Sequence, residues 1–283
     1  MNFQTLIAAE RLRDLISQPT ALVIIDCSFD LADPAAGERS HLQAHLPGAH
    51  YLHLDNDLSG AKTGRNGRHP LPSRDAFAER AGALGITPST QVVVYDRQQA
   101  MYAARLWWML RWLGHTAVAV LDGGLPAWKS IGGPLESGAT AAAVPAPPYP
   151  PREPQAGSID ADALGRRLGR VRVIDARAPE RFRGDVEPLD TRAGHIPGAR
   201  NRFFKDNLAG DGRFKPADEL RSEFEPLVSA GPIHEVVHQC GSGVTACHNL
   251  LAMEHAGLAG SVLYPGSWSE WSADPSRPVA QGA

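Results

Sequence analysis

The chain has 283 residues, of which 43% are hydrophobic, and its formal net charge is −3 at neutral pH. This length exceeds that of a common single domain, so we expect two domains, each able to bury its own core. A net charge this small gives no field that would attract nucleic acid or an anionic membrane. An anionic ligand must therefore be bound by a few well-placed groups.

Cysteine usage indicates the compartment. Cys27, Cys240 and Cys247 are too few for a disulfide framework, and their odd number suits a reducing environment. Residues 1–16 do not follow the pattern of a secretion signal, in which basic residues precede an apolar stretch. No apolar run approaches the roughly 20 residues that span a bilayer. We expect a soluble, cytoplasmic protein without a membrane segment.

An internal repeat organises the chain. An apolar run that ends in an aspartate precedes a His-x-Pro-Gly-Ala motif, a second apolar run and a Gly- and Trp-containing segment, and this order occurs twice. The motif stands at 45–49 and returns 150 positions later at 195–199, as HLPGA and HIPGA. Two copies are too few for a solenoid, so the repeat predicts two similar domains.

Both copies alternate short β-branched runs with stretches of helical periodicity. Short apolar strands separated by helices predict a parallel sheet that is covered on both faces. Residues 103–115 are a helix candidate, with Leu106, Met109, Leu110 and Leu113 spaced to bury one side. The predicted fold class is α/β, and functional residues are expected where strands end and helices begin.

A proline-rich stretch separates the two copies. Proline fixes φ and removes an N–H donor, so PAPPYPPREP at 145–154, within the stretch 134–157, can form neither a helix nor a central strand. We place the first domain at 1–135, an extended linker at 136–157 and the second domain at 158–283.

The loop after the strand at 235–240 carries the chemistry. Gly241 and Gly243 follow Cys240, and a helix is expected to begin near Val244 or Thr245. Glycines let successive N–H groups turn toward one centre, and the helix N-terminus adds partial positive charge. A cysteine in such a cradle is expected to be a thiolate, and the same cradle would stabilise the terminal sulfur of a persulfide, Cys–S–S⁻.

The other two thiols lack this setting. A lone cysteine is most often a small buried hydrophobe, and Cys247 lies inside the expected helix, while no glycine loop follows Cys27. We interpret both as structural. The repeat places Asp96 opposite Cys240, so the first domain has no nucleophile.

These motifs, in this order, resemble the tandem rhodanese family across nearly the whole chain. The resemblance implies two rhodanese-like domains, an inactive first copy and a catalytic second copy, with the active site at the domain interface. The loop Cys-Gly-Ser-Gly-Val-Thr at 240–245 is similar to the branch that uses 3-mercaptopyruvate. Thiosulfate-specific relatives carry basic residues where this chain has Gly241 and Ser242, because a dianion needs positive charge at the loop.

The resemblance implies a two-step transfer. Cys240 would take sulfur from 3-mercaptopyruvate, release pyruvate and pass the sulfur to cyanide, a thiol or a thioredoxin-like acceptor. Splitting the transfer into two displacements is covalent catalysis, and ping-pong kinetics are expected. Thiosulfate:cyanide sulfurtransferase is the alternative within the family. A cysteine phosphatase would need an arginine to close the loop, but residues 246–248 are Ala, Cys and His. A non-catalytic sulfur carrier is disfavoured by the intact loop around Cys240.

The mercaptopyruvate branch also implies a Ser-His-Asp arrangement. Ser242 would bond the ketone oxygen as charge develops, His69 would relay a proton and Asp55 would orient His69. Asp57 is a rival for the position of Asp55. The loop residues around Cys240 would surround the donor, namely Gly241, Gly243, Val244 and Thr245.

Two arginines are implied for the carboxylate of the donor. Arg181 matches the first, and a planar guanidinium suits bidentate binding. The second should follow Glu187-Pro188, where this chain has Leu189 instead. We expect Arg192 to substitute from a different backbone position.

Histidines cluster in the first domain, but their spacing matches no closed zinc pattern, and no cysteine joins them. We expect neither a metal nor a cofactor. The histidines in question are His41, His45, His50, His53 and His69.

Overall fold

The computed structural model describes residues 2–228 and 231–283. The chain divides into two compact units. The first comprises Met1–Gly60, Pro72–Gln155 and Asp211–Arg213, and the second comprises Ala61–Leu71, Ala156–Gly210 and Phe214–Ala283. Residues 61–71 therefore belong to the second unit although they lie within the first sequence repeat. The sequence repeat did not predict this assignment.

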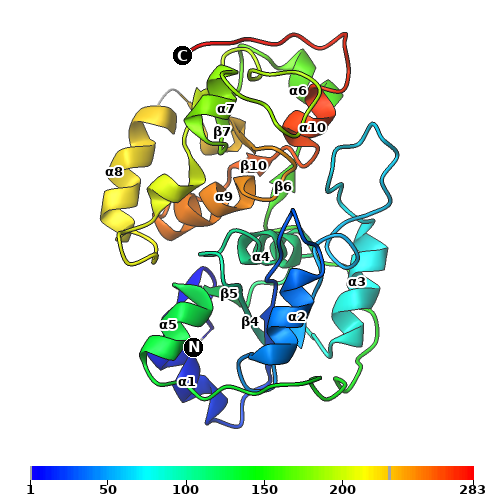
Figure 1. The fold of residues 1–283 in the computed structure, drawn as a ribbon, viewed down its shortest axis with the longest axis vertical. Helices are drawn as coiled ribbons and strands as arrows, with labels where there is room; N and C mark the ends of the chain where they lie inside the picture. Colours follow the sequence, from blue (N-terminus) through cyan, green and yellow to red (C-terminus); the bar gives the residue numbers. More distant parts are fainter. Residues whose placement is uncertain (1, 229–230) are drawn as a thin grey trace. The chain divides into compact units, whose positions relative to one another are not determined.

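The first unit contains one sheet of five parallel strands in the order β1-β5-β4-β2-β3 (Figure 1). Helices follow the strands along the chain, as the alternating sequence pattern predicts. Its elements are β1 Leu6–Ile7, α1 Ala9–Ile16, β2 Leu22–Asp26, α2 Ala36–Gln43, β3 His50–Tyr51, α3 Arg74–Ala83, β4 Gln91–Tyr95, α4 Ala103–Trp112, β5 Val118–Leu121 and α5 Gly124–Ser130.

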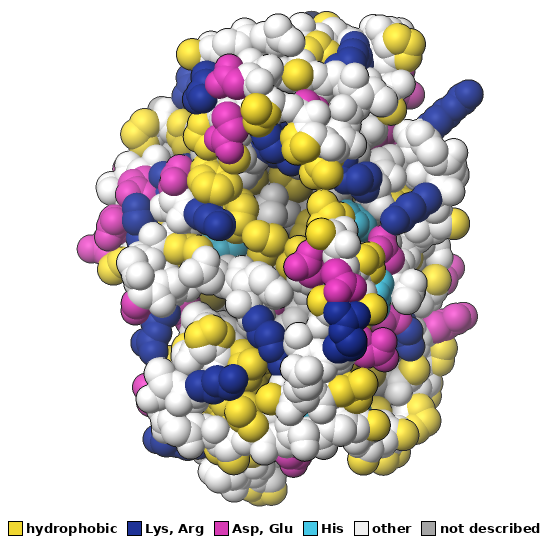
Figure 2. All heavy atoms as spheres, in the orientation of Figure 1, with side chains coloured by type: hydrophobic (Ala, Val, Ile, Leu, Met, Phe, Trp, Pro, Cys, Tyr) yellow, Lys and Arg dark blue, Asp and Glu magenta, His cyan; other side chains and the backbone are white. Residues whose placement is uncertain are grey.

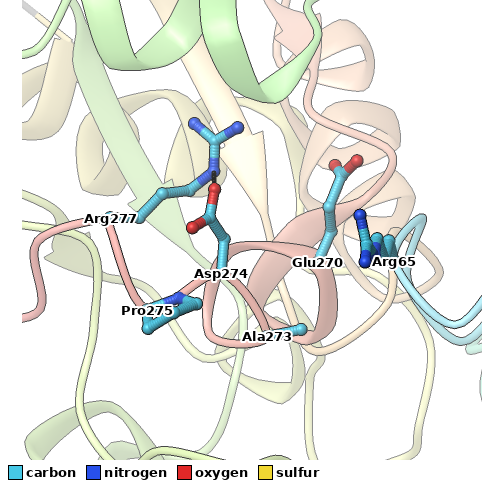
Figure 3. A pocket seen from close by; sticks show the side chains of 6 residues that line it. All are labelled: Arg65, Glu270, Ala273, Asp274, Pro275 and Arg277. Atoms are coloured by element: carbon cyan, nitrogen blue, oxygen red, sulfur yellow. Dashed lines mark ion pairs between the residues drawn. The ribbon is translucent and has the colours of Figure 1, made fainter.

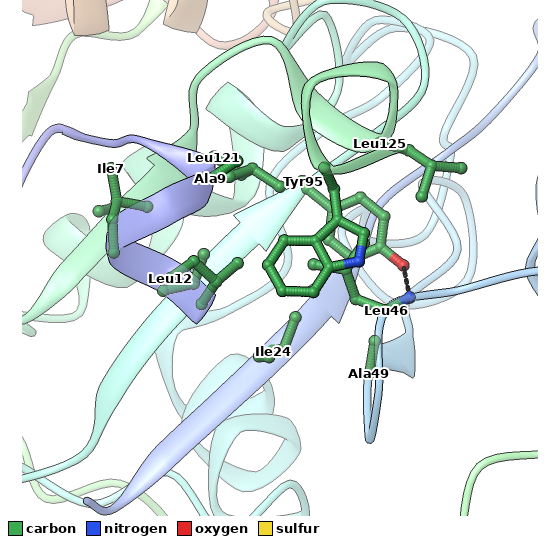
Figure 4. Close-up of a cluster of buried hydrophobic side chains, with 12 residues drawn as sticks. Ile7, Ala9, Leu12, Ile24, Leu46, Ala49, Tyr95, Leu121 and Leu125 are labelled. Carbon is green, nitrogen blue, oxygen red and sulfur yellow. Dashed lines mark hydrogen bonds between the residues drawn. The ribbon is translucent and has the colours of Figure 1, made fainter. Parts of the chain in front are cut away.

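Side chains from one face of this sheet pack against α1 and α5. Figure 4 shows Ile24 and Tyr95 of the strands beside Leu12 and Leu125 of the helices, with the Tyr95 hydroxyl bonded to the backbone N–H of Leu46. Alternate strand residues point to the opposite face, which α4 covers through its contacts with β4 and β5. The sheet is thus buried on both faces, as is typical of parallel sheets.

The second unit repeats this topology, with parallel strands in the order β6-β10-β9-β7-β8. Counted along the chain, each strand occupies the position of its counterpart in the first unit, so the sequence repeat corresponds to a repeat of fold. Its elements are β6 Gly157–Ser158, α6 Ala161–Arg166, β7 Arg172–Asp175, α7 Pro179–Arg183, β8 Arg200–Asn201, the 3₁₀ helix Phe204–Asn207, α8 Ala217–Val228, the 3₁₀ helix Ile233–Glu235, β9 Val236–Gln239, α9 Ala246–His255, β10 Val262–Leu263 and α10 Ser267–Trp271.

Both His-x-Pro-Gly-Ala motifs form the same turn. The N–H of Ala49 donates to the carbonyl of Leu46, and the N–H of Ala199 donates to that of Ile196, each at 3.0 Å. Gly48 has φ +67°. Proline at the second position and a glycine of positive φ at the third describe a type II turn. The motif is therefore structural in both copies.

Two local expectations differ from the structure. The helix α4 is buried on all sides rather than on one. Arg105 and Trp108 are fully buried, as are its aliphatic residues. Within the predicted linker, Tyr149 is buried and its N–H donates to the carbonyl of Ala78 at 2.9 Å. An aromatic side chain thus ties this stretch to the first unit.

Charged side chains of both signs are interspersed on the surface that Figure 2 shows, without a broad patch of one sign on that face. Within residues 2–228 and 231–283, no helix has the length and apolar character that crossing a membrane requires.

Candidate active site

Cys240 lies directly after β9 and is only 1% exposed. Its backbone is held by the start of α10. The N–H of Cys240 donates to Ser267 Oγ at 3.1 Å, and its carbonyl accepts from the N–H of Trp268 at 3.0 Å. The carbonyl of Gly241 accepts from the N–H of Ser269 at 2.9 Å. The nucleophile candidate therefore stands on a fixed backbone.

Ser267 is a residue that the sequence analysis missed. Its φ of +54° is unusual for a residue other than glycine, and such strain is found at functional sites. Its hydroxyl donates to the carbonyl of Tyr264 at 2.9 Å and accepts the N–H of Cys240, so two hydrogen bonds offset the strain. In the first unit Gly124 has φ +57° at the corresponding position. An alignment of the two repeats could have revealed the strained position, because Ser267 stands where the first repeat has Gly124.

Glycine at 243 is required by space as well as by conformation. Gly243 has φ +75°, and a Cβ there would lie 2.2 Å from the carbonyl oxygen of Pro265. Val244 is buried, and α9 begins at Ala246, one residue after Thr245. The loop 241–245 thus leads directly into a helix N-terminus, close to where the sequence pattern placed it.

The corresponding loop of the first unit shows what this cradle can bind. Both carboxylate oxygens of Asp96 accept backbone N–H groups, one from Gln98 and Ala100, the other from Tyr102 and Ala103, at 2.8–2.9 Å. Burial raises the pKa of Asp96, while the four N–H donors act in the opposite direction. The loop between β4 and α4 is thus an anion site filled by the protein itself.

His69 and Ser242 lie together in the second unit. His69 Nδ1 is 2.7 Å from Ser242 Oγ, and both side chains are buried. The segment that carries His69 approaches α10 closely. The N–H of Arg68 donates to Ser269 Oγ at 3.0 Å, and a Cβ on Gly67 would lie 2.7 Å from the carbonyl oxygen of Gly266. The pair is therefore positioned by packing of residues 61–71 within this unit.

Two guanidinium groups lie against the loop at Gly241. A Cβ on Gly241 would meet Nη2 of Arg68 at 2.8 Å and Nη1 of Arg181 at 3.4 Å. Arg181 Nη2 donates to Glu187 Oε1 at 2.7 Å and to Asp190 Oδ2 at 3.1 Å, and Arg68 pairs with the other oxygen of Asp190. Burial raises the pKa of Asp190, and the two guanidinium groups oppose this. The sequence analysis named Arg181 as a candidate and did not name Arg68.

Arg192 is engaged elsewhere in the second unit. Its guanidinium nitrogens donate to four backbone carbonyls near the end of α10 and beyond it, at 2.5–3.1 Å. These contacts favour a role in fixing the chain after α10, and its binding of the donor stays a prediction. The four carbonyls belong to Trp271, Ser272, Asp274 and Arg277.

Asp55 belongs to the first unit, where its backbone N–H donates to His53 Nδ1 at 3.1 Å. Its proposed orientation of His69 stays a prediction. The rival Asp57 is used locally, because its carboxylate accepts the N–H of His53 at 2.7 Å and pairs with Arg80.

Comparison with known proteins agrees with this geometry. A sequence profile of the rhodanese-like domain matches residues 8–131 and again residues 160–274. The chain belongs to the rhodanese-like family.

Full-length relatives are named for two different donors. A protein of Pseudomonas aeruginosa named "Probable 3-mercaptopyruvate sulfurtransferase" is 46% identical, with all of both chains covered. A Mycobacterium tuberculosis protein named "Putative thiosulfate sulfurtransferase SseB" is 40% identical over 99% of this chain and 98% of its own. The solved 3-mercaptopyruvate sulfurtransferase from Leishmania major superimposes with a TM-score of 0.85 at 31% identity, covering 95% of this chain and 74% of that one.

The remaining cysteines of the chain are part of the core. Cys247 is fully buried in α9 and its thiol donates to the carbonyl of Gly243 at 3.4 Å. Burial raises the pKa of Cys27, and the carboxylates of Asp26 and Asp96 raise it further. Neither thiol has the setting of Cys240, in agreement with the structural interpretation.

Histidines of the rhodanese repeat make local bonds. Nδ1 of His45 and of His195 each lies 2.8 Å from a backbone carbonyl oxygen, that of His41 and of Phe182, respectively. His41 itself lies 3.2 Å from a carboxylate oxygen of Asp26. These contacts support a structural role for the motif histidines.

A separate cavity of about 460 Å³ lies beside α10 (Figure 3). Two of its charged groups are used in packing. Asp274 pairs with Arg277 at 3.3 Å, and Arg277 also pairs with Asp162 at 2.7 Å. Burial raises the pKa of Glu270, and the nearby Tyr264 acts in the opposite direction. The chemistry that the family implies is expected at Cys240 rather than here.

Proposed function

We propose that this rhodanese is a sulfurtransferase that takes sulfur from 3-mercaptopyruvate, holds it as a persulfide on Cys240 and releases pyruvate. The observation that carries the proposal is the hydrogen bond between His69 and Ser242, which lies in the loop that follows Cys240. A hydroxyl bonded to an imidazole can donate to a ketone oxygen, whereas thiosulfate has no ketone to receive it. The full-length similarity to the Pseudomonas relative supports the same donor.

In the first step the Cys240 thiolate attacks the sulfur of the donor. An S–S bond forms, the C–S bond breaks, and its electron pair moves onto carbon to give the enolate of pyruvate. Ser242 donates a hydrogen bond to the enolate oxygen, and His69 supplies or relays the proton that completes pyruvate. In the proposed arrangement Asp55 orients His69.

In the second step a nucleophile attacks the terminal sulfur of the persulfide and the Cys240 thiolate leaves. Cyanide would become thiocyanate, and a thiol or a thioredoxin-like protein would become a persulfide. Each sulfur is transferred through a covalent enzyme intermediate, which predicts ping-pong kinetics. A cytoplasmic location is part of the proposal, because Cys27, Cys240 and Cys247 form no disulfide among the described residues, which suits a compartment that keeps thiols reduced.

One observation favours thiosulfate as a second candidate donor. The loop itself carries no cation, but Arg68 and Arg181 bring two guanidinium groups to Gly241. A dianion needs such charge. Both groups are already paired with Asp190 and Glu187, which reduces the charge available to thiosulfate.

Steady-state kinetics with both donors test the proposal directly. We expect a higher kcat/KM for 3-mercaptopyruvate than for thiosulfate. Cys240→Ser should lose turnover with either donor, because a serine oxygen cannot hold a transferable sulfur. Intact-mass spectrometry should show one added sulfur on the donor-treated wild type and none on the variant.

Cys247→Ser is the matched control, since its thiol lies in the core of the same unit. It should keep its activity and still gain one sulfur. Turnover retained by Cys240→Ser would disprove the assignment of the nucleophile, and a preference for thiosulfate would move this chain to the second candidate function.

A further inference from the structure

We propose that the cavity beside α10 binds the sulfur acceptor, and that it takes a small thiol carrying both an ammonium and a carboxylate group. The inference rests on the proposed function, because it names the class of acceptor for the second step. Three observations support it, namely two opposite charges without an ion-pair partner, an acid that only one repeat has, and two segments that join the cavity to the Cys240 loop.

Four charged residues line this cavity of about 460 Å³ (Figure 3). Asp274 and Arg277 pair with each other at 3.3 Å, so their charges balance. Arg65 and Glu270 form no ion pair within residues 2–228 and 231–283. Among the described residues, the cavity therefore presents one unpaired cation and one unpaired anion, which is the complement of a zwitterion.

Glu270 is the group that most needs a partner. Its side chain is half-buried, and a carboxylate in such a place is costly unless it is compensated. Burial raises the pKa of Glu270, while Tyr264 and Arg277 act in the opposite direction. An ammonium group that enters the cavity would supply the counter-charge that the protein leaves out.

The acid occurs in only one of the two repeats. Gly123 and Gly266 occupy equivalent positions before α5 and α10, and four residues later the first repeat has Ala127 where the second has Glu270. A Cβ on Gly123 would lie 2.8 Å from Ala127, and a Cβ on Gly266 would collide with the carboxylate of Glu270. The first unit fills this position without a charge, so packing of the helix does not require an acid.

Two segments of the second unit lead from the cavity to the loop. One carries Arg65 at the cavity and, four residues later, His69 in contact with the loop. The other is α10, which carries Glu270 at the cavity and Trp268, whose N–H donates to the carbonyl of Cys240 at 3.0 Å. A thiol bound in the cavity is thus held beside the backbone that positions the persulfide.

In this arrangement Glu270 binds the ammonium group of the acceptor and Arg65 binds its carboxylate. The acceptor thiolate attacks the terminal sulfur of the persulfide and forms a new S–S bond. The bond between that sulfur and Cys240 Sγ breaks, and Cys240 leaves as a thiolate. The product is the persulfide of the acceptor, so the step needs no further oxidant or reductant.

Two solvated surface charges would behave differently. If Arg65 and Glu270 only compensated each other, their removal would change KM alike for thiols of every charge, or not at all. A bound zwitterion instead links each residue to one group of the acceptor, so each variant should respond only to thiols that carry that group.

The decisive measurement uses four small thiols as acceptors at saturating donor. L-Cysteine has both charged groups, cysteamine lacks the carboxylate, 3-mercaptopropionate lacks the ammonium group and 2-mercaptoethanol lacks both. Glu270→Gln should raise KM roughly tenfold for cysteine and cysteamine only, as expected for one lost bond to a charged group. Arg65→Ala should raise KM about two- to fivefold for cysteine and 3-mercaptopropionate only, because its charge is exposed. Each comparison uses the same thiol in two proteins, so differences in thiol acidity cancel.

Arg170→Ala is the matched control, since Arg170 is an exposed arginine of the same unit that does not line the cavity. It should match the wild type with all four thiols. KM values that change uniformly, or not at all, in Glu270→Gln and Arg65→Ala would overturn the inference. Thermal unfolding, and transfer to cyanide at the wild-type rate, show that a variant is folded with an intact loop.

Binding of L-serine tests the cavity without any chemistry, because serine has both charged groups and no thiol. Calorimetry should show that serine binds the wild type and binds Glu270→Gln roughly tenfold more weakly. No binding to the wild type would contradict the inference, whatever the variants do.

Failure of the proposed function can be told apart from failure of this inference. If 3-mercaptopyruvate does not load Cys240, the proposed function fails, while thiosulfate as the donor and serine binding still test the cavity. If sulfur is transferred from 3-mercaptopyruvate and serine does not bind, only the inference fails.

Discussion

The contact between His69 and Ser242 is the smallest feature on which the proposed chemistry depends. At 2.7 Å it joins residues that are 173 positions apart in the chain. Both side chains are buried, so water competes little for either partner. In the proposed mechanism a hydroxyl held in this way is preorganised to stabilise charge on a ketone oxygen without reorganising during the reaction.

Ser242→Ala tests this role. The variant should slow sulfur abstraction from 3-mercaptopyruvate by about 10²-fold or more, the size expected for one lost oxyanion-type donor. Thiosulfate loading should change little, because that donor has no ketone. Rapid-mixing measurement of Cys240 loading with each donor separates this step from the acceptor step. Equal slowing with both donors would mean that Ser242 only shapes the loop.

Residues of the site differ in how well sequence alone could identify them. Cys240, Ser242 and Gly243 are neighbours in one loop, so local pattern predicts where they lie. Arg68 is invisible to such reasoning because its partners Gly241 and Asp190 come from remote segments. The role of Ser267 likewise depends on a tertiary contact with the backbone of Cys240.

At the scale of elements, β9 positions the candidate nucleophile at the edge of the sheet and also buries a histidine. His238 lies two residues before Cys240, is fully buried and has Nε2 3.1 Å from the sulfur of Met253. Burial lowers its pKa to about 3. The strand was predictable from its branched residues, but the neutral state of His238 follows only from how α9 and the sheet enclose it.

His238 should make the fold sensitive to acid. The unfolded chain binds a proton near pH 6.5 and the folded chain does not until about pH 3, so stability falls as pH falls through this window. Between pH 6.5 and pH 5 the loss is about 2 kcal/mol. His238→Leu should reduce this loss, measured as the shift in urea unfolding midpoint between pH 8 and pH 5. His234→Leu, on an exposed side chain of the same stretch, should keep the wild-type shift. The same shift in both variants would contradict the assignment.

On the scale of the whole chain, the two compact units are not two consecutive pieces. The sequence repeat predicted two similar folds, and the shared strand order agrees with it. Residues 61–71 nevertheless belong to the second unit, and residues 211–213 belong to the first. Periodicity and motif spacing describe local structure, so exchanged segments of this kind leave little signal in them.

Cleavage of the chain between the exchanged segments should therefore leave an associated enzyme. Residues 141–145 are largely exposed, with Val144 at 88%, and a specific protease site placed there should be cut readily. We expect the two pieces to elute together in size-exclusion chromatography and to keep sulfur transfer, because each piece carries a segment embedded in the other unit. The uncut protein with the same insertion is the control. Separation of the pieces with retained activity in one of them would show that the exchanged segments are dispensable.

Because Asp96 stands where the second copy has Cys240, it limits the number of sulfur atoms that one chain can carry. Its carboxylate accepts the four N–H groups of the loop, and it offers no thiol, so the proposed chemistry gives this loop no place to load a sulfur atom. The repeat thus doubles the fold without doubling the number of sulfur-carrying sites. In the proposed mechanism each chain stores a single activated sulfur on Cys240, so without an acceptor the release of pyruvate should stop after one equivalent.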